Sequence, residues 1–144
     1  MLRPTHLLAV AAMLAACSEP QQARAPETPA TADTAEATGV IINTPASGAR
    51  VTSPFVAEGT APGDWYFEAQ FVGQLRGADG ATLAEAPARA QENWMTEAPV
   101  PYRATFTFSV TQDTPATLVL QEDMPADQAH PREVAIPVVL LPTG

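Results

Sequence analysis

The feature that most constrains the fold is a strict alternation of side-chain character between residues 102 and 110. Polar residues such as Arg103 and Thr105 separate the apolar ones. Successive side chains of a β-strand point to opposite faces of the sheet, so a period of two predicts a strand with one buried face. The predicted inward set is Tyr102, Ala104, Phe106, Phe108 and Val110.

A similar alternation extends from residue 65 to residue 75, with Glu68 among the polar positions. Turn residues such as Gly77–Gly80 separate the extended segments. Pro54 and Pro137 lack an amide donor, so we expect a bulge or a sheet edge at these positions. The other predicted strands cover residues 40–43, 50–59, 81–86, 116–121 and 133–141.

About seven strands without a helical stretch predict an all-β fold, an immunoglobulin-like antiparallel β-sandwich over residues 39–144. The chain has one cysteine, so no internal disulfide can join the two layers. Side-chain packing must hold them together instead. The predicted core aromatic residues are Trp65, Phe67, Phe71, Phe106 and Phe108.

The first 17 residues have the layout of a bacterial secretory signal, with a basic start, a short apolar run and small residues before Cys17. The apolar run is too short to span a bilayer. The letters LAAC at 14–17 resemble the lipobox, whose cysteine sulfur receives a diacylglyceryl group before the signal is cut. We therefore predict a lipoprotein signal at 1–16 and lipid attachment at Cys17. An ordinary secretory signal with an incidental cysteine is the alternative.

Residues 17–38 are predicted to be the lipidated cysteine and a flexible linker, because this segment is rich in proline and small polar residues. Acyl chains attach such a protein to a membrane. Ser18 stands where an aspartate tends to retain lipoproteins at the inner membrane, which favours the outer membrane, facing the periplasm. The net charge is −9, and no basic cluster is present, so we expect no nucleic-acid partner.

Four residues of a long connection, Trp94, Met95, Thr96 and Glu97, form the candidate binding surface together with Glu68. Two interpretations stay open. Trp94 either plugs an open end of the sandwich or offers an exposed aromatic contact to a partner. Glu68 is expected on the outer face of its strand or in an ion pair with an arginine such as Arg103.

No catalytic residue, metal site or cofactor is predicted. After signal removal the chain keeps one histidine, His130, which we interpret as a solvated loop residue. Calcium requires dense oxygen ligands, for which the candidates are Asp79, Glu122, Asp123 and Asp127. We interpret these acids as solvated turn residues, with a weak calcium site as the alternative.

Three segments resemble the immunoglobulin-like domain of bacterial spore germination, the Gmad family. They read IINTPASGARVTSPFVAEGTAPG, WYFEAQFVGQLRGADGATLAEA and ENWMTEAPVPYRATFTF. The likeness extends from Val40 to Leu141. The sequence departs from the family's Asp-Asn-Pro-Ser-Gly turn at QEDMPADQAHP, where Asp123–Asp127 reads DMPAD.

The resemblance implies a non-catalytic envelope domain with an undefined ligand, and such domains also occur in lipoproteins of bacteria that form no spores. From the sequence we expect a lipid-anchored binding or scaffolding protein with an envelope protein or a cell-wall polymer as partner. An envelope hydrolase or accessory subunit acting on cell-wall material, and a purely structural accessory protein, are the alternatives.

Overall fold

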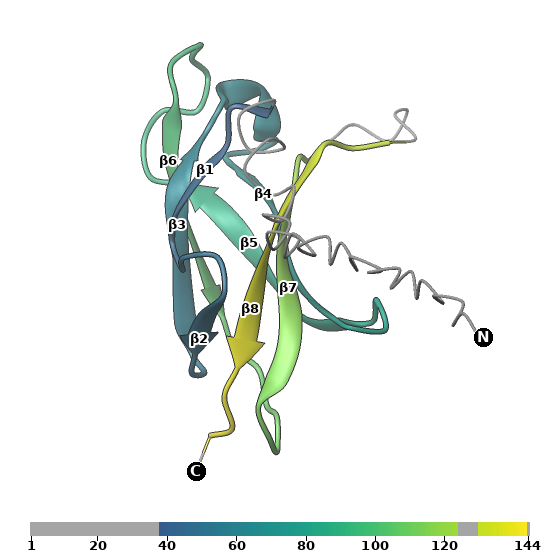
Figure 1. Cartoon of the computed structure of the whole chain (residues 1–144). Helices are drawn as coiled ribbons and strands as arrows, with labels where there is room; N and C mark the ends of the chain where they lie inside the picture. The colour runs from purple at the N-terminus through teal and green to yellow at the C-terminus, as the bar shows by residue number, and fades with distance from the viewer. Residues whose placement is uncertain (1–37, 124–129, 144) are drawn as a thin grey trace, which may run out of the picture.

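The computed structural model describes residues 38–123 and 130–143, and these form eight strands and one short 3-10 helix, η1 (Figure 1). The predicted signal, Cys17 and all but the last residue of the linker lie outside the described residues, as does Asp127. The elements are β1 (Ile41–Thr44), β2 (Ala49–Val51), β3 (Phe55–Ala61), η1 (Gly63–Trp65), β4 (Gln70–Gly77), β5 (Thr82–Ala90), β6 (Val100–Phe106), β7 (Thr114–Gln121) and β8 (Glu133–Leu140).

All eight strands belong to one curled sheet in the order β1-β3-β6-β5-β4-β7-β8-β2. The curl gives two layers, with β1, β3 and β6 in one and β4, β7, β8 and β2 in the other. Strand β5 connects them, because it pairs along β4 but meets β6 only at Arg89 and Ala90. This arrangement confirms the all-β, immunoglobulin-like prediction.

Two details of the predicted topology are corrected. The expected extended segment 50–59 is divided between two strands on opposite layers, which raises the strand number from about seven to eight. Strand β3 pairs with β1 and β6, whereas β2 pairs with β8 in parallel, so the sheet is mixed and not purely antiparallel. The ladder between β2 and β8 begins at Val138, directly after Pro137, whose carbonyl oxygen accepts a bond from the Gly48 amide at 2.7 Å.

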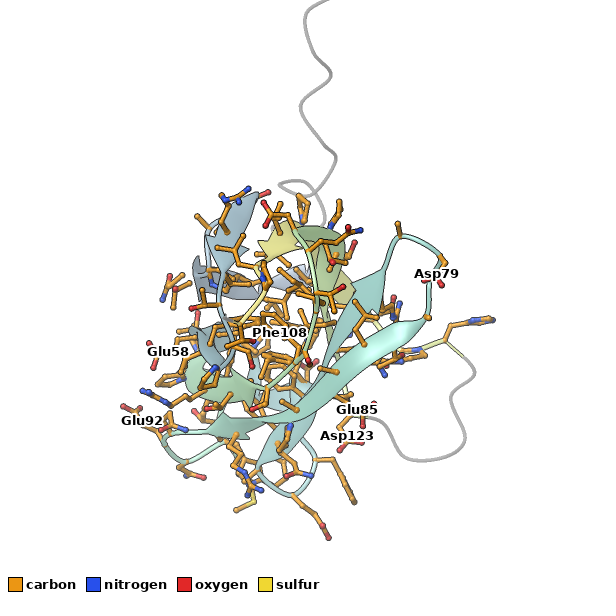
Figure 2. All side chains as sticks on the ribbon, turned by 90° about the horizontal axis from the view of Figure 1, so that it is seen from below. Glu58, Asp79, Glu85, Glu92, Phe108 and Asp123 are labelled. Atoms are coloured by element: carbon orange, nitrogen blue, oxygen red, sulfur yellow. The ribbon has the colours of Figure 1, made fainter. Side chains whose placement is uncertain are left out.

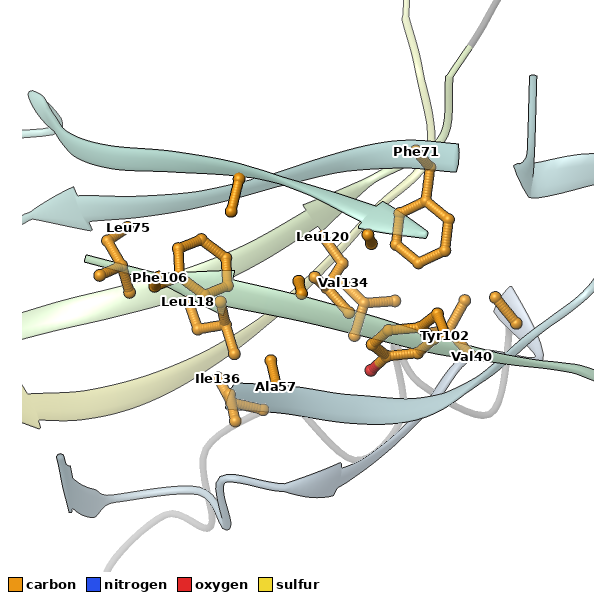
Figure 3. Close-up of a cluster of buried hydrophobic side chains, with 14 of the residues drawn as sticks. Val40, Ala57, Phe71, Leu75, Tyr102, Phe106, Leu118, Leu120, Val134 and Ile136 are labelled. Atoms are coloured by element: carbon orange, nitrogen blue, oxygen red, sulfur yellow. The ribbon is translucent and has the colours of Figure 1, made fainter. Parts of the chain in front are cut away.

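The predicted alternation is confirmed, because Tyr102, Ala104, Phe106 and Phe108 are buried while the residues between them are exposed. The strand itself is shorter than predicted, because β6 ends at Phe106. These buried side chains belong to a hydrophobic cluster that spans both layers (Figure 3). The ring centroids of Phe71 on β4 and Tyr102 on β6 lie 5.1 Å apart. Phe55 of β3 stacks on Phe106, with 5.2 Å between the ring centroids. In Figure 2, which looks along the sandwich from below, Phe108 lies between the layers and the labelled acids lie at the periphery.

The predicted strand at 65–75 is wrong over its first five residues. Trp65 ends η1, and the chain then reverses in a tight turn in which the Phe67 and Gln70 backbones exchange bonds of 2.9 and 3.1 Å. Glu68 and Ala69 occupy the turn with φ of 48° and 65°, a conformation that a strand excludes. As a result Phe67, expected in the core, is 47% exposed, while Trp65 is buried as expected.

Gly73 allows the two layers to approach each other. A Cβ at this position would lie 2.7 Å from Cζ of Phe106 in the opposite layer and 3.1 Å from the Ala86 carbonyl oxygen. The missing side chain at Gly73 of β4 therefore accommodates the inward ring of Phe106 on β6. This contact replaces part of the cohesion that a disulfide gives to antibody domains.

We predict that Gly73→Ala lowers the free energy of unfolding by about 1–3 kcal/mol, because the added methyl overpacks the space filled by Phe106. Chemical denaturation measures the change. Adding Phe106→Leu to this variant should recover part of the loss, although Phe106→Leu alone destabilises the wild type. Equal midpoints for Gly73→Ala and wild type would contradict this account of the layer contact.

Candidate functional site

Three connections gather at one end of the sandwich, here called the apical end and drawn at the top of Figure 1. Because neighbouring strands are antiparallel, β3, β5 and β7 finish at this end and β4, β6 and β8 begin there. The connections comprise residues 62–69, residues 91–99 and the ends of the segment between β7 and β8. The described chain also begins here, next to η1 (Figure 1).

Backbone contacts hold the three apical connections together. A Cβ on Gly63 would lie 2.5 Å from the Trp94 carbonyl oxygen and 2.2 Å from that of Thr96, so the 91–99 loop rests directly on η1. The Asp123 amide donates to the Trp65 carbonyl oxygen at 3.0 Å, which ties the end of β7 to the same helix. Only glycine fits at position 63.

The candidate residues of the 91–99 loop differ in their environment. Trp94 is half-buried and packs against the hydrophobic core, as a plug would. Met95 is 72% exposed, and its amide donates to Oδ1 of Asn93 at 3.1 Å. Thr96 and Glu97 are exposed, and Oγ1 of Thr96 accepts the Ala98 amide at 3.2 Å. The loop thus packs Trp94 against the core and exposes Met95 to solvent. Its role in binding stays a prediction.

Glu68 lies at the tip of the Phe67–Gln70 turn and is exposed to solvent, not on the outer face of a strand. The predicted alternative, an ion pair with Arg103, is also wrong. Arg103 pairs with Glu58 across the β3–β6 ladder at 2.5 Å. The turn instead adds the exposed ring of Phe67 to the apical end.

An ionic cluster that we did not predict from the sequence lies beneath the apical connections. Glu122 is only 6% exposed, and its two carboxylate oxygens accept bonds from the amide and Nε of Arg132 at 2.7 and 2.5 Å. Arg132 also pairs with Asp64 at 3.0 Å, and its guanidinium carbon lies 5.5 Å from the ring centroid of Trp65. The cluster joins η1 to both ends of the β7–β8 connection.

The charge state of Arg132 follows from these contacts. Partial burial lowers the pKa of its guanidinium, but the hydrogen bonds to Glu122 and Asp64 raise it by more, so the pKa is raised overall. Arg132 is therefore a permanent cation that compensates the buried Glu122 carboxylate. A detectable signal existed in the sequence, because the β7–β8 register that pairs Gln121 with Glu133 also brings Glu122 opposite Arg132.

The interpretation of Glu122 as a solvated turn acid is wrong, because both of its carboxylate oxygens accept hydrogen bonds from Arg132. Asp79 accepts the Ala81 amide at 3.1 Å within the Gly77–Gly80 turn, Asp123 is half-buried, and His130 is exposed. Across residues 38–123 and 130–143, no three His, Cys, Asp or Glu side chains are placed to hold a metal ion together. The described residues contain no helix of sufficient length and hydrophobicity to cross a membrane.

The two-layer curled sheet and its loop-bearing end define an immunoglobulin-like domain. Residues 39–129 match the family model of Gmad2, the immunoglobulin-like domain of bacterial spore germination, over more than half of the chain. The chain belongs to this family, which is a family of immunoglobulin-like domains and not a known enzyme family. Comparison with curated proteins and with solved structures found no match. The matched region ends before β8, although β8 pairs with β7 along its length.

We predict that Trp94→Ala lowers the free energy of unfolding by about 1–3 kcal/mol, because it removes a ring packed on the core, whereas Met95→Ala changes it by less than about 0.5 kcal/mol. Thermal unfolding of both variants measures the difference. Met95→Ala is the matched control in the same loop. A Trp94→Ala variant as stable as wild type would show that the tryptophan is not a plug.

Proposed function

We propose that this protein is a lipid-anchored envelope protein whose immunoglobulin-like domain is a non-catalytic binding or scaffolding module. The observation that carries the proposal is membership of the Gmad2 family. The predicted lipobox at 14–17 supports the anchor, and Ser18 supports attachment to the outer membrane, facing the periplasm. The partner is an envelope protein or a cell-wall polymer.

The place where the chain enters the domain determines which end of the sandwich lies nearest the predicted lipid anchor. The described chain begins at the apical end, next to η1 (Figure 1), where a Cβ on Gly39 would lie 3.1 Å from Cγ of Pro62. A flexible linker of the length of residues 18–38 has an end-to-end distance of roughly 25 Å. The apical end therefore stays within reach of the membrane surface, and the exposed side chains of Phe67 and Met95 would contact a partner held close to that membrane.

Replacement of Cys17 tests the anchor. Cys17→Ser should abolish incorporation of radioactive palmitate and release the protein from the membrane fraction, because a hydroxyl cannot form the thioether. Ser18→Ala is the matched control and should be labelled like wild type. Palmitate labelling that persists in Cys17→Ser would remove lipid anchoring from the proposal.

Site-specific crosslinking in cells tests the binding role. A photoreactive amino acid at Met95 should capture one envelope component reproducibly. The same probe at Leu83, which is 42% exposed and lies near the opposite end of β5, should not capture it. If neither position gives a specific product, the apical end is not a binding surface, and a purely structural role becomes the better interpretation.

A further inference from the structure

A shallow groove crosses the outer face of β5, at the corner where the sheet passes from one layer to the other. It consists of two hollows of about 320 and 220 Å³ that share Pro87 and Arg89. Gln70 and Val72 of β4 border the larger hollow, and Arg103 and Thr105 of β6 border the smaller one. Neither Phe67 nor Met95 lines the groove.

Two arginines face each other in this groove. Arg89 and Arg103 are direct partners in the β5–β6 ladder, an arrangement in which like charges repel. Glu58 compensates Arg103, but no hydrogen bond or ion pair of the described residues involves the guanidinium of Arg89. The other arginines within residues 38–123 and 130–143 all pair with an acid: Arg50 with Asp113, Arg76 with Glu133, Arg103 with Glu58, and Arg132 with Asp64 and Glu122.

The same groove borders an interrupted sheet edge. Continued past Arg89 and Arg103, the register would bring Ala88 opposite Ala104 and then Pro87 opposite Thr105, but the two strands pair at only two positions and separate before these pairs form. Pro87 has no amide hydrogen to donate, so the ladder lacks one of its bonds at this point. Both residues line the smaller hollow. Backbone groups of two diverging strands therefore border the guanidinium of Arg89.

We propose that this groove binds an extended acidic peptide segment of a partner protein, with one of its carboxylates held between Arg89 and Arg103. Guanidinium groups bind carboxylates through paired, charge-assisted hydrogen bonds. Gln70 and Gln91 supply amide donors and acceptors that match a peptide backbone. The inference rests on the proposed binding role and names a second surface and the chemistry of its partner.

A peptide fits the groove better than a wall glycan. The aromatic residue among the lining side chains, Phe71, is 0% exposed, so no ring face is available for stacking against a sugar. Glu85 also lines the larger hollow, and its carboxylate accepts a hydrogen bond from Nε2 of Gln74 at 3.1 Å. Because this carboxylate repels other anions, the carboxylate of a ligand would bind at the end near Arg89. A segment with a carboxylate at one position and neutral residues beside it satisfies both features.

The test uses the full chain in micelles of a neutral detergent and a fluorescein-labelled peptide, (Thr-Glu)5-amide, with fluorescence anisotropy as the readout. The matched probe (Thr-Gln)5-amide has no carboxylates. We expect saturable binding of the acidic probe that weakens with added salt, and at least tenfold weaker binding of the neutral probe. Hydrogen–deuterium exchange should show protection of β5 and β6 on binding.

Arg89→Gln should weaken binding of the acidic probe about tenfold, because it removes the uncompensated charge while leaving every described ion pair in place. Arg50→Gln, which removes the same charge from β2, should change the affinity by less than twofold. Three results would overturn the proposal: no binding, an equal loss in both variants, or protection at the β1 or β2 edge instead of β5 and β6. Binding of a soluble wall-glycan fragment at Arg89 without binding of the peptide would also overturn it.

Failure of this site is distinguishable from failure of the proposed function. Crosslinking at Met95 and palmitate labelling at Cys17 do not depend on Arg89. Positive results in those experiments, together with no peptide binding, would leave the anchored binding module intact and remove only the acidic-peptide groove.

Discussion

The insertion of Phe106 into the space left by Gly73 is the contact on which the two-layer body depends. No second cysteine is present to connect the layers, and the hydrogen-bonded sheet crosses between them only through two residue pairs of β5 and β6. The layers must therefore stay together through side-chain packing. The rings of Phe55, Phe71 and Tyr102 extend this packing from one end of the core to the other.

The apical connections are also held by backbone contacts and by an ionic cluster. Gly63 allows the 91–99 loop to lie on η1, and Arg132 holds Glu122 and Asp64 together over Trp65. A buried ion pair adds little net stability, but loss of one partner leaves an uncompensated charge. The cluster thus fixes the position of these connections, so that Met95 projects from a supported surface.

Side-chain periodicity was sufficient to predict the inward face of β6 and the all-β class, because period two reports directly on which face is buried. It failed at Phe67, since alternation alone does not detect a turn whose central residues, Glu68 and Ala69, both have positive φ. Neither the parallel pairing of β2 nor the contact of Trp94 with the core has a local signal, because both depend on segments distant in the sequence. The Glu122–Arg132 pair could have been predicted from the pairing of β7 with β8, which places these two residues opposite each other.

The distribution of charge separates residues that serve the fold from residues available to a partner. In a chain of net charge −9, acids are abundant, and four of the five arginines in residues 38–123 and 130–143 pair with one. Arg89 has no acidic partner among the described residues, and it faces Arg103 on the adjacent strand. Proline at position 87 keeps the neighbouring edge from closing. A repulsive pair beside an open edge is unfavourable in the free domain, and an anionic extended segment would relieve both features at once.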